Sequence, residues 1–332
     1  MKPKHSRLWI LGAVLWALAV PAGAQGTAPL TPIKIGIFPG NTSSSIWVIA
    51  DQQGFYAREG LKAQFVNFSN GPALAAAVVS GSVDVAYGAS SVSFDLAKQS
   101  SKLVVLGDFA EYMNWNIIVA KDKATSSVAA GFPANVKSLK GLKIGVTALG
   151  GVVNKFVLAL FESAGVAPGD VTLIATGASN TAIPALKNGR VDGLAAVVSL
   201  QDLQHQGIAA VTVVDAGIKD NAGPVGTGAL GILDTTSRAF MEKDPATLNK
   251  YCKAMIATVA WAQDPANYDA VSQLVAKQLN IPPALAAEEL KHDLVSYTNT
   301  LPEAVWNAQP KWVTGGGNVP TYHDTVHASC GR

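Results

Sequence analysis

Ile33-Lys34-Ile35-Gly36-Ile37 and Leu142-Lys143-Ile144-Gly145-Val146 repeat one pattern, an apolar run with lysine second and glycine fourth. A second shared motif follows each copy, Gly81-Ser82-Val83-Asp84 in the first and Gly189-Arg190-Val191-Asp192 in the second. From the lysine to the first glycine of that motif, the chain advances 47 residues in the first copy and 46 in the second. A duplicated unit with nearly equal spacing predicts two similar α/β lobes, and two lobes predict a ligand cleft between them.

The Gly-x-Val-Asp motif of each copy is expected to build a turn. Glycine supplies the left-handed conformation that ends a helix, and valine begins the next buried strand. The aspartate carboxylate can accept backbone N–H groups and hold the connection. We therefore expect Asp84 and Asp192 to be architectural and the ligand to be bound elsewhere.

The N-terminus has the layout of a secretory signal peptide. Three basic and no acidic side chains accompany an apolar run over residues 8–20, and small residues follow at 22–24. This pattern predicts a signal peptide over residues 1–24 and a periplasmic protein. No cysteine follows the apolar run, so we expect no lipid anchor.

Composition excludes some classes of partner. The chain has 332 residues, with 25 Lys and Arg against 23 Asp and Glu, and removal of residues 1–24 leaves a formal net charge of −1. Nucleic-acid binding needs a basic surface, which this balance does not provide. We expect an exported monomer with no nucleic-acid partner and no cofactor.

Cys252 and Cys330 are the two cysteines of the chain. In an oxidising compartment such a pair predicts a disulfide, which would tie the C-terminal tail to a helix. The alternative is a buried Cys252 and a free Cys330. The histidines after residue 24 show no metal-ligand spacing, so no metal site is expected; they are His205, His292, His323 and His327.

Strand and helix patterns alternate along the chain. Strands are predicted over residues 33–38, 63–68, 83–87 and 103–106, and again over 143–146, 171–175, 191–197 and 211–214. This alternation predicts parallel βαβ units throughout, with right-handed crossovers. We place lobe one at residues 33–118 and 228–332, and lobe two at residues 119–227.

Ligand contacts are expected where strands end and helices begin, because free N–H groups and the helix dipole there attract anionic oxygens. These segments contain no Lys or Arg, which favours one anionic group held by neutral donors. Each hydroxyl has the alternative role of capping its helix. The candidate ligand-binding residues in these loops are Asn41, Thr42, Ser44, Ser69, Asn70, Gly71, Ser90, Ser91, Thr147, Gly150, Gly151, Ser179, Asn180 and Ser199.

Two further expectations concern the geometry of the cleft. Ser91 and Ser199 stand at matching points of the two copies, so we expect them to face each other across the gap. Asn114 and Trp115 lie near the exit from lobe one, and Trp115 is the aromatic residue expected to line the cleft.

Four motifs together resemble the nitrate/sulfonate/taurine/pyrimidine-precursor family of ABC-transporter substrate-binding proteins. The resemblance spans residues 33–235 and rests on GFYAREGL at 54–61, SNG at 69–71, GSVD at 81–84 and LKGLKIGV at 139–146. It implies an α/β protein of the type II periplasmic-binding-protein fold, with two Rossmann-like lobes and a ligand cleft and hinge between them. It also implies hinge closure on a small anionic ligand, which is then delivered to an ABC permease in the inner membrane.

Two departures from the family pattern bear on the ligand. The loop Gly150-Gly151-Val152 lacks the serine that often follows glycine in relatives. Residues 195–199 contain no aromatic or acidic side chain, whereas relatives that bind amino-sulfonates often have both there. An alkyl- or aryl-sulfonate, or an aromatic carboxylate, therefore fits better than taurine.

Two other functions remain open alternatives. An exported sensor would present its closed form to a signalling partner. An enzyme of pyrimidine-precursor synthesis on the same fold would need histidine and cysteine in the cleft. The candidate loops contain neither residue type, so we expect no enzymatic activity.

Overall fold

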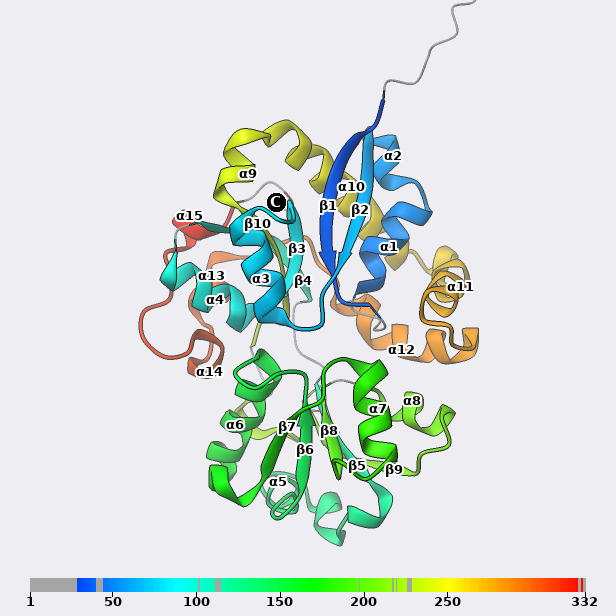
Figure 1. The fold of residues 1–332 in the computed structure, drawn as a ribbon, viewed down its shortest axis with the longest axis vertical. Helices are drawn as coiled ribbons and strands as arrows, with labels where there is room; N and C mark the ends of the chain where they lie inside the picture. The colour runs from blue at the N-terminus through cyan, green and yellow to red at the C-terminus, as the bar shows by residue number, and fades with distance from the viewer. Residues whose placement is uncertain are drawn as a thin grey trace, which may run out of the picture.

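The chain forms two lobes, each built on a five-stranded sheet (Figure 1). No described helix is long and apolar enough to cross a membrane. The signal peptide predicted over residues 1–24 lies outside the described residues. The computed structural model describes residues 29–39, 44–100, 102–110, 115–196, 198–216, 218, 220–225, 229–327 and 330.

The sheet of lobe one has the strand order β2-β1-β3-β10-β4, with β1 parallel to both of its neighbours. Its strands are β1 (Thr31–Ile37), β2 (Leu61–Asn67), β3 (Val85–Ala89), β4 (Leu103–Ala110) and β10 (Ile232–Ser237). The helices that precede the second lobe are α1 (Ser45–Gln52), α2 (Phe55–Arg58), α3 (Gly71–Ser80) and α4 (Ser90–Gln99).

The sheet of lobe two has the corresponding order β7-β6-β8-β5-β9, with β6 parallel to both neighbours. Its strands are β5 (Asn116–Ala120), β6 (Lys143–Val146), β7 (Thr172–Ala175), β8 (Gly193–Ala195) and β9 (Ala210–Asp215). Its helices are α5 (Ala134–Lys137), α6 (Val152–Ala164), α7 (Ser179–Lys187) and α8 (Leu200–His205).

Two strands break the predicted parallel pattern, so that expectation is wrong for them. β10 runs antiparallel to β3 and β4, and β5 runs antiparallel to β8 and β9. Each is the first strand after the chain crosses from one lobe to the other. Such a strand begins at the edge near the other lobe, where the parallel strands end, so it runs in the opposite direction. The boundary placed between residues 118 and 119 falls inside β5, which pairs wholly within lobe two.

The repeated glycine allows close packing on β1 and β6, which hold the same position in their two sheets. Ile33 and Ile35 are fully buried on the face of β1 that α1 and α10 cover. Gly36 points to the opposite face, where a Cβ would lie 2.3 Å from Cδ1 of Leu74 on α3. At Gly145 in lobe two, a Cβ would lie 2.7 Å from the Leu194 side chain. In both lobes the glycine leaves room for a leucine side chain on the sheet.

The predicted architectural role of the two motif aspartates is confirmed. Gly81 ends α3 with a φ of 74°. The backbone N–H of Lys34 donates to Oδ2 of Asp84 at 2.8 Å, and the N–H of Lys143 donates to Oδ2 of Asp192 at 2.9 Å. Each carboxylate thus binds the backbone of a neighbouring parallel strand, within β1 in lobe one and at the start of β6 in lobe two.

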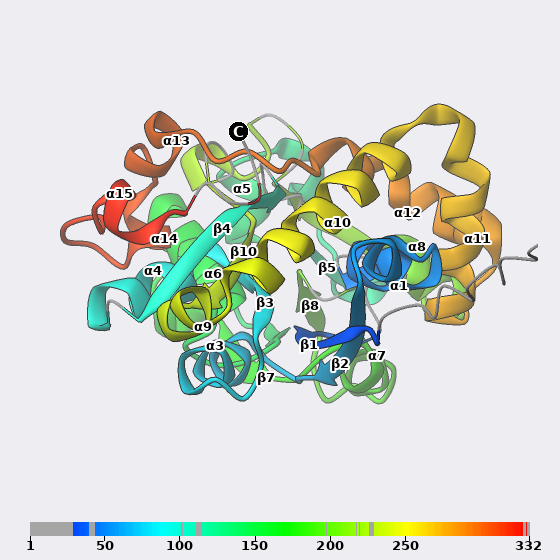
Figure 2. The same cartoon turned by 90° about the horizontal axis from the view of Figure 1, so that it is seen from above.

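After β10 the chain completes lobe one with helices. Figure 2 shows α11 and α12 at one end of the lobe and α13 to α15 at the other, with α10 between them. Cys252 on α10 and Cys330 near the C-terminus form a disulfide. The helices are α9 (Arg238–Lys243), α10 (Pro245–Gln263), α11 (Tyr268–Leu279), α12 (Pro283–Ser296), α13 (Glu303–Asn307), α14 (Lys311–Thr314) and α15 (Tyr322–Thr325).

Candidate functional site

The residue just before α1 contacts β3, the strand next to β1 in the sheet. The hydroxyl oxygens of Ser44 and Tyr87 lie 2.5 Å apart, and the backbone N–H of Phe38 donates to Oγ of Ser44 at 3.2 Å. The rings of Phe38 and Tyr87 meet edge to face with centroids 5.1 Å apart. Because β1 and β3 are adjacent and parallel, their carboxyl ends share one edge, which faces lobe two (Figure 1).

Two buried hydroxyls at this edge have no hydrogen-bond partner in the described part of the chain. Ser45 begins α1 and is 1% exposed, whereas Ser91 is the second residue of α4 and is fully buried. No side chain at the N-cap position caps either helix. A buried hydroxyl without a partner costs about 1–3 kcal/mol. Two such hydroxyls beside two helix starts could both donate to one oxyanion.

Ser90 and the loop after β2 have structural roles. The Ser90 hydroxyl donates to the carbonyl oxygen of Leu230 at 2.6 Å, which fixes the chain as it enters β10. Oδ1 of Asn70 accepts the N–H of Ala73 at 3.0 Å and caps α3. Ser69 is exposed, and Gly71 is the first residue of α3.

In lobe two, the loops after β6 and β7 lie together. The N–H of Gly177 donates to the carbonyl oxygen of Thr147 at 3.2 Å. The N–H of Gly150 donates to Oδ1 of the buried Asn154 at 2.9 Å. No side chain caps α6 at its N-cap Gly151, and none caps α7, which begins with Ser179 and the exposed Asn180. These are therefore two further helix starts whose N-cap side chains accept no backbone N–H.

Ser199 caps α8. Its Oγ accepts the N–H of Asp202 at 2.9 Å, and the carboxylate of Asp202 accepts the N–H of Ser199 in return. The capping alternative therefore describes Ser199 as the structure shows it. Its position opposite Ser91 stays a prediction. Asn41, Thr42 and Asn114 lie outside the described residues.

Trp115 belongs to an aromatic cluster that includes residues of both lobes. It lies just before β5, and its ring meets that of Phe156 on α6 edge to face at 5.3 Å. Trp312 on α14 lies 5.8 Å from Phe156 and 6.4 Å from Trp115, measured between ring centroids. Nothing in the sequence pattern linked Trp312 to this place. Ser45 ends the hydroxyl-rich run over residues 42–45, which lies in a segment where the sequence predicts ligand contacts.

Buried polar side chains pack beneath α1. Trp47 on α1 stacks on Tyr87 at 4.6 Å, and its indole N–H donates to the hydroxyl of Tyr251 at 2.7 Å. Tyr251 lies near the fully buried Asp234 of β10, but no hydrogen bond of normal geometry reaches either carboxylate oxygen. Burial therefore dominates and raises the pKa of Asp234 from its usual 3.8 to about 8.

The described residues contain no group of three side chains suited to hold a metal ion. Comparison with protein families matches residues 26–276 to the NMT1-like family. Comparison with curated proteins gave no match.

Solved structures of similar fold include the alkanesulfonate-binding protein SsuA from Xanthomonas axonopodis pv. citri bound to MOPS. It is 18% identical with a TM-score of 0.69, and the alignment covers 90% of this chain and 99% of that one. The periplasmic nitrate-binding protein NrtA from Synechocystis PCC 6803 is 16% identical with a TM-score of 0.60, covering 77% and 69%. DszB in complex with biphenyl-2-sulfinic acid is 14% identical with a TM-score of 0.55, covering 83% and 88%. These likenesses show the periplasmic-binding-protein fold.

Proposed function

This chain belongs to the NMT1-like family, and from that membership and the site geometry we propose that it is the solute-binding component of an ABC importer. It captures a small organic anion between its lobes and delivers it to a permease in the inner membrane. The ligand is an alkyl- or aryl-sulfonate or an aromatic carboxylate. The protein acts in the periplasm as a monomer, after residues 1–24 are removed.

The observation that carries this proposal is the pair of buried hydroxyls on Ser45 and Ser91, which have no hydrogen-bond partner among the described residues. They lie in the first turns of helices that follow two adjacent strands, so both can face one oxyanion headgroup. The helix dipoles favour negative charge at the same place. Neutral donors suit a singly charged headgroup, and the half-buried ring of Trp115 suits an organic tail.

In this function the protein binds its ligand and does not convert it chemically. Both cysteines are buried and joined to each other, which supports a role without a thiol nucleophile. A ligand that is recovered unchanged after incubation would favour binding, and a converted ligand would favour the enzyme alternative.

The test is a thermal-shift series with methanesulfonate, benzenesulfonate, benzoate and taurine. A ligand that binds only the folded state raises the melting temperature. We expect benzenesulfonate, methanesulfonate or benzoate to raise it, and taurine to have little effect. No shift with any of the first three would overturn the proposed ligand class.

Serine variants identify the binding surface. Ser45→Ala and Ser91→Ala should abolish most of the ligand shift and leave the melting temperature of the free protein unchanged or higher, because each removes an unsatisfied buried hydroxyl. Ser90→Ala is the matched control. It should lower the melting temperature of the free protein, because it breaks the bond to Leu230, and should keep the ligand shift. An undiminished ligand shift in both the Ser45 and Ser91 variants would contradict this site.

A further inference from the structure

The two lobes contact each other through helices that begin near the proposed site. α4 of lobe one follows β3, and α6 of lobe two follows β6. α6 lies against both α4 and α14. Both helices start where a strand ends, at the edge of a sheet. Their contact therefore fixes how closely these edges of the two sheets approach each other.

An ion pair crosses between the lobes at this contact. The ammonium group of Lys155 on α6 pairs with Oδ2 of Asp95 on α4. The two side chains are 23% and 35% exposed, so solvent and salt screen the pair less than they would on an open surface. It lies in the second turn of α4 and the first of α6, close to the starts of both helices.

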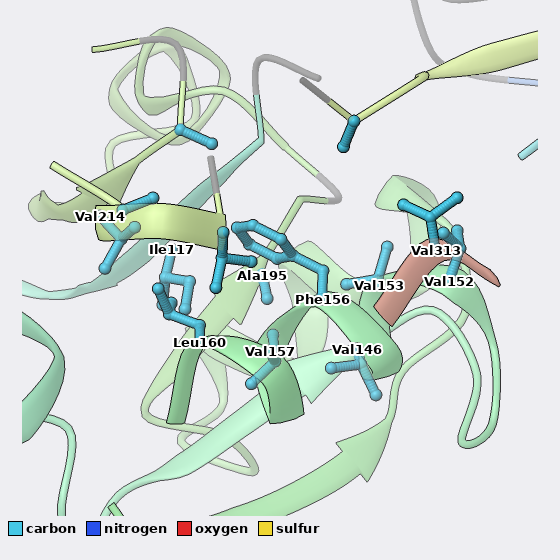
Figure 3. Close-up of a cluster of buried hydrophobic side chains, with 14 of the residues drawn as sticks. Ile117, Val146, Val152, Val153, Phe156, Val157, Leu160, Ala195, Val214 and Val313 are labelled. Carbon is cyan, nitrogen blue, oxygen red and sulfur yellow. The ribbon is translucent and has the colours of Figure 1, made fainter. Parts of the chain in front are cut away.

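Apolar side chains continue the same contact. Figure 3 shows Val313 of α14 beside Val152 and Val153 of α6. Trp312 of α14 lies against Phe156 of α6. One hydrophobic cluster therefore contains residues of both lobes.

Lobe one holds α14 firmly. The ammonium group of Lys98 at the end of α4 donates to the carbonyl oxygens of Thr314 and Gly316. Phe94 of α4 stacks on Trp306 of α13 at 4.2 Å. The segment that carries these contacts lies beyond residue 276, where the match to the family ends.

We propose that Asp95, Lys155 and Trp312 form a latch that holds the two lobes together without a ligand and so positions both halves of the binding site. The latch residues act on affinity through lobe position. A ligand then has less of its binding energy to spend on closing the lobes, because the competent arrangement is already populated.

The first test is small-angle X-ray scattering of the free protein. Asp95→Asn should increase the radius of gyration, and so should 1 M salt. The exchanged pair Asp95→Lys with Lys155→Asp should restore the compact value, which a merely structural role of either residue would not predict. Asp170→Asn, which breaks the Lys140–Asp170 ion pair within lobe two, is the control and should leave the radius unchanged.

The second test measures affinity for the ligand that gives the largest thermal shift. Asp95→Asn should weaken binding about twofold to fivefold, the range expected for a partly exposed ion pair. Trp312→Phe keeps an aromatic ring and should fold. It should increase the radius of gyration of the free protein less than Trp312→Ala does. Unchanged scattering for Asp95→Asn, or no recovery in the exchanged pair, would overturn the latch. Because scattering needs no ligand, a failed search for ligands leaves this test intact.

Discussion

At the scale of single residues, Asp234 ties stability to pH. Its carboxyl group is buried beneath α1 and has a pKa of about 8, whereas in the unfolded chain it ionises with the usual value of 3.8. Between those two values the folded protein keeps a proton that the unfolded chain has lost. Folding is then coupled to proton uptake, so this group makes the free energy of unfolding fall as pH rises.

Asp234→Asn, which imitates the neutral acid, should remove that fall. We expect the variant to gain on the natural protein by at most about 1.4 kcal/mol per pH unit between pH 4 and 8. Urea unfolding of both proteins at four pH values in this window measures the difference. A difference that does not change with pH would contradict a buried neutral Asp234.

Gly36 tests the packing of α3 on β1. Gly36→Ala would place a methyl group in the space that Leu74 occupies, and overpacking of this kind costs about 1–3 kcal/mol. The control is Gly169→Ala, because a Cβ there meets nothing within 4 Å. Denaturant unfolding should show a loss for the first variant and no loss for the second. Equal stability of the two variants would disprove the packing argument.

At the residue scale, sequence reasoning succeeded where both partners belong to one copy of the repeat, as Lys34 and Asp84 do. The turn role of Asp84 follows from Gly-x-Val-Asp itself, because the carboxylate bonds to the neighbouring strand in both copies. It did not separate Ser90 from Ser91. These neighbours differ only in what lies opposite them, and Leu230 is 140 residues away from Ser90. A partner so distant leaves no local signal.

At the scale of elements, the strands predicted from the sequence are present, but β5 and β10, which run antiparallel to their neighbours, were not among them. β5 has the apolar residues of a buried strand, whereas β10 continues after Ile232 and Leu233 with Asp, Thr, Thr and Ser, which gives no apolar pattern. Their direction is set by where the chain re-enters each lobe, which is a property of the connection between lobes. The position of α14 against lobe two was equally hidden, since four residues carry no periodic pattern.

The disulfide fixes the C-terminal segment to α10. It joins Cys252 to Cys330 across 78 residues that include α11 to α15. A bridge over a loop of this length contributes about 4 kcal/mol in the chain-entropy view. The double variant Cys252→Ala and Cys330→Ala should lower the free energy of unfolding by about that much.

Guanidinium unfolding measures this effect, and a reducing agent supplies the control. The reducing agent should lower the free energy of unfolding of the natural protein and leave that of the double variant unchanged. If full reduction of the bridge leaves the stability of the natural protein unchanged, the expected contribution is refuted.

At the scale of the whole molecule, two lobes were predictable because a duplicated pattern needs two hydrophobic cores. How the lobes touch was not predictable, because Asp95 and Lys155 are unremarkable charges in the sequence. The latch makes lobe separation a measurable equilibrium. It also separates two properties that are easily confused, the chemistry that recognises a ligand and the free energy that brings the lobes together.

The place of β10 has a consequence for the order of assembly. β10 lies between β3 and β4, yet all of lobe two is synthesised between β4 and β10. The sheet of lobe two comes from one continuous stretch of the chain, so it can form before synthesis of the chain is complete. Lobe one must wait for β10, an inner strand of its sheet, and pairing over such distances is slow.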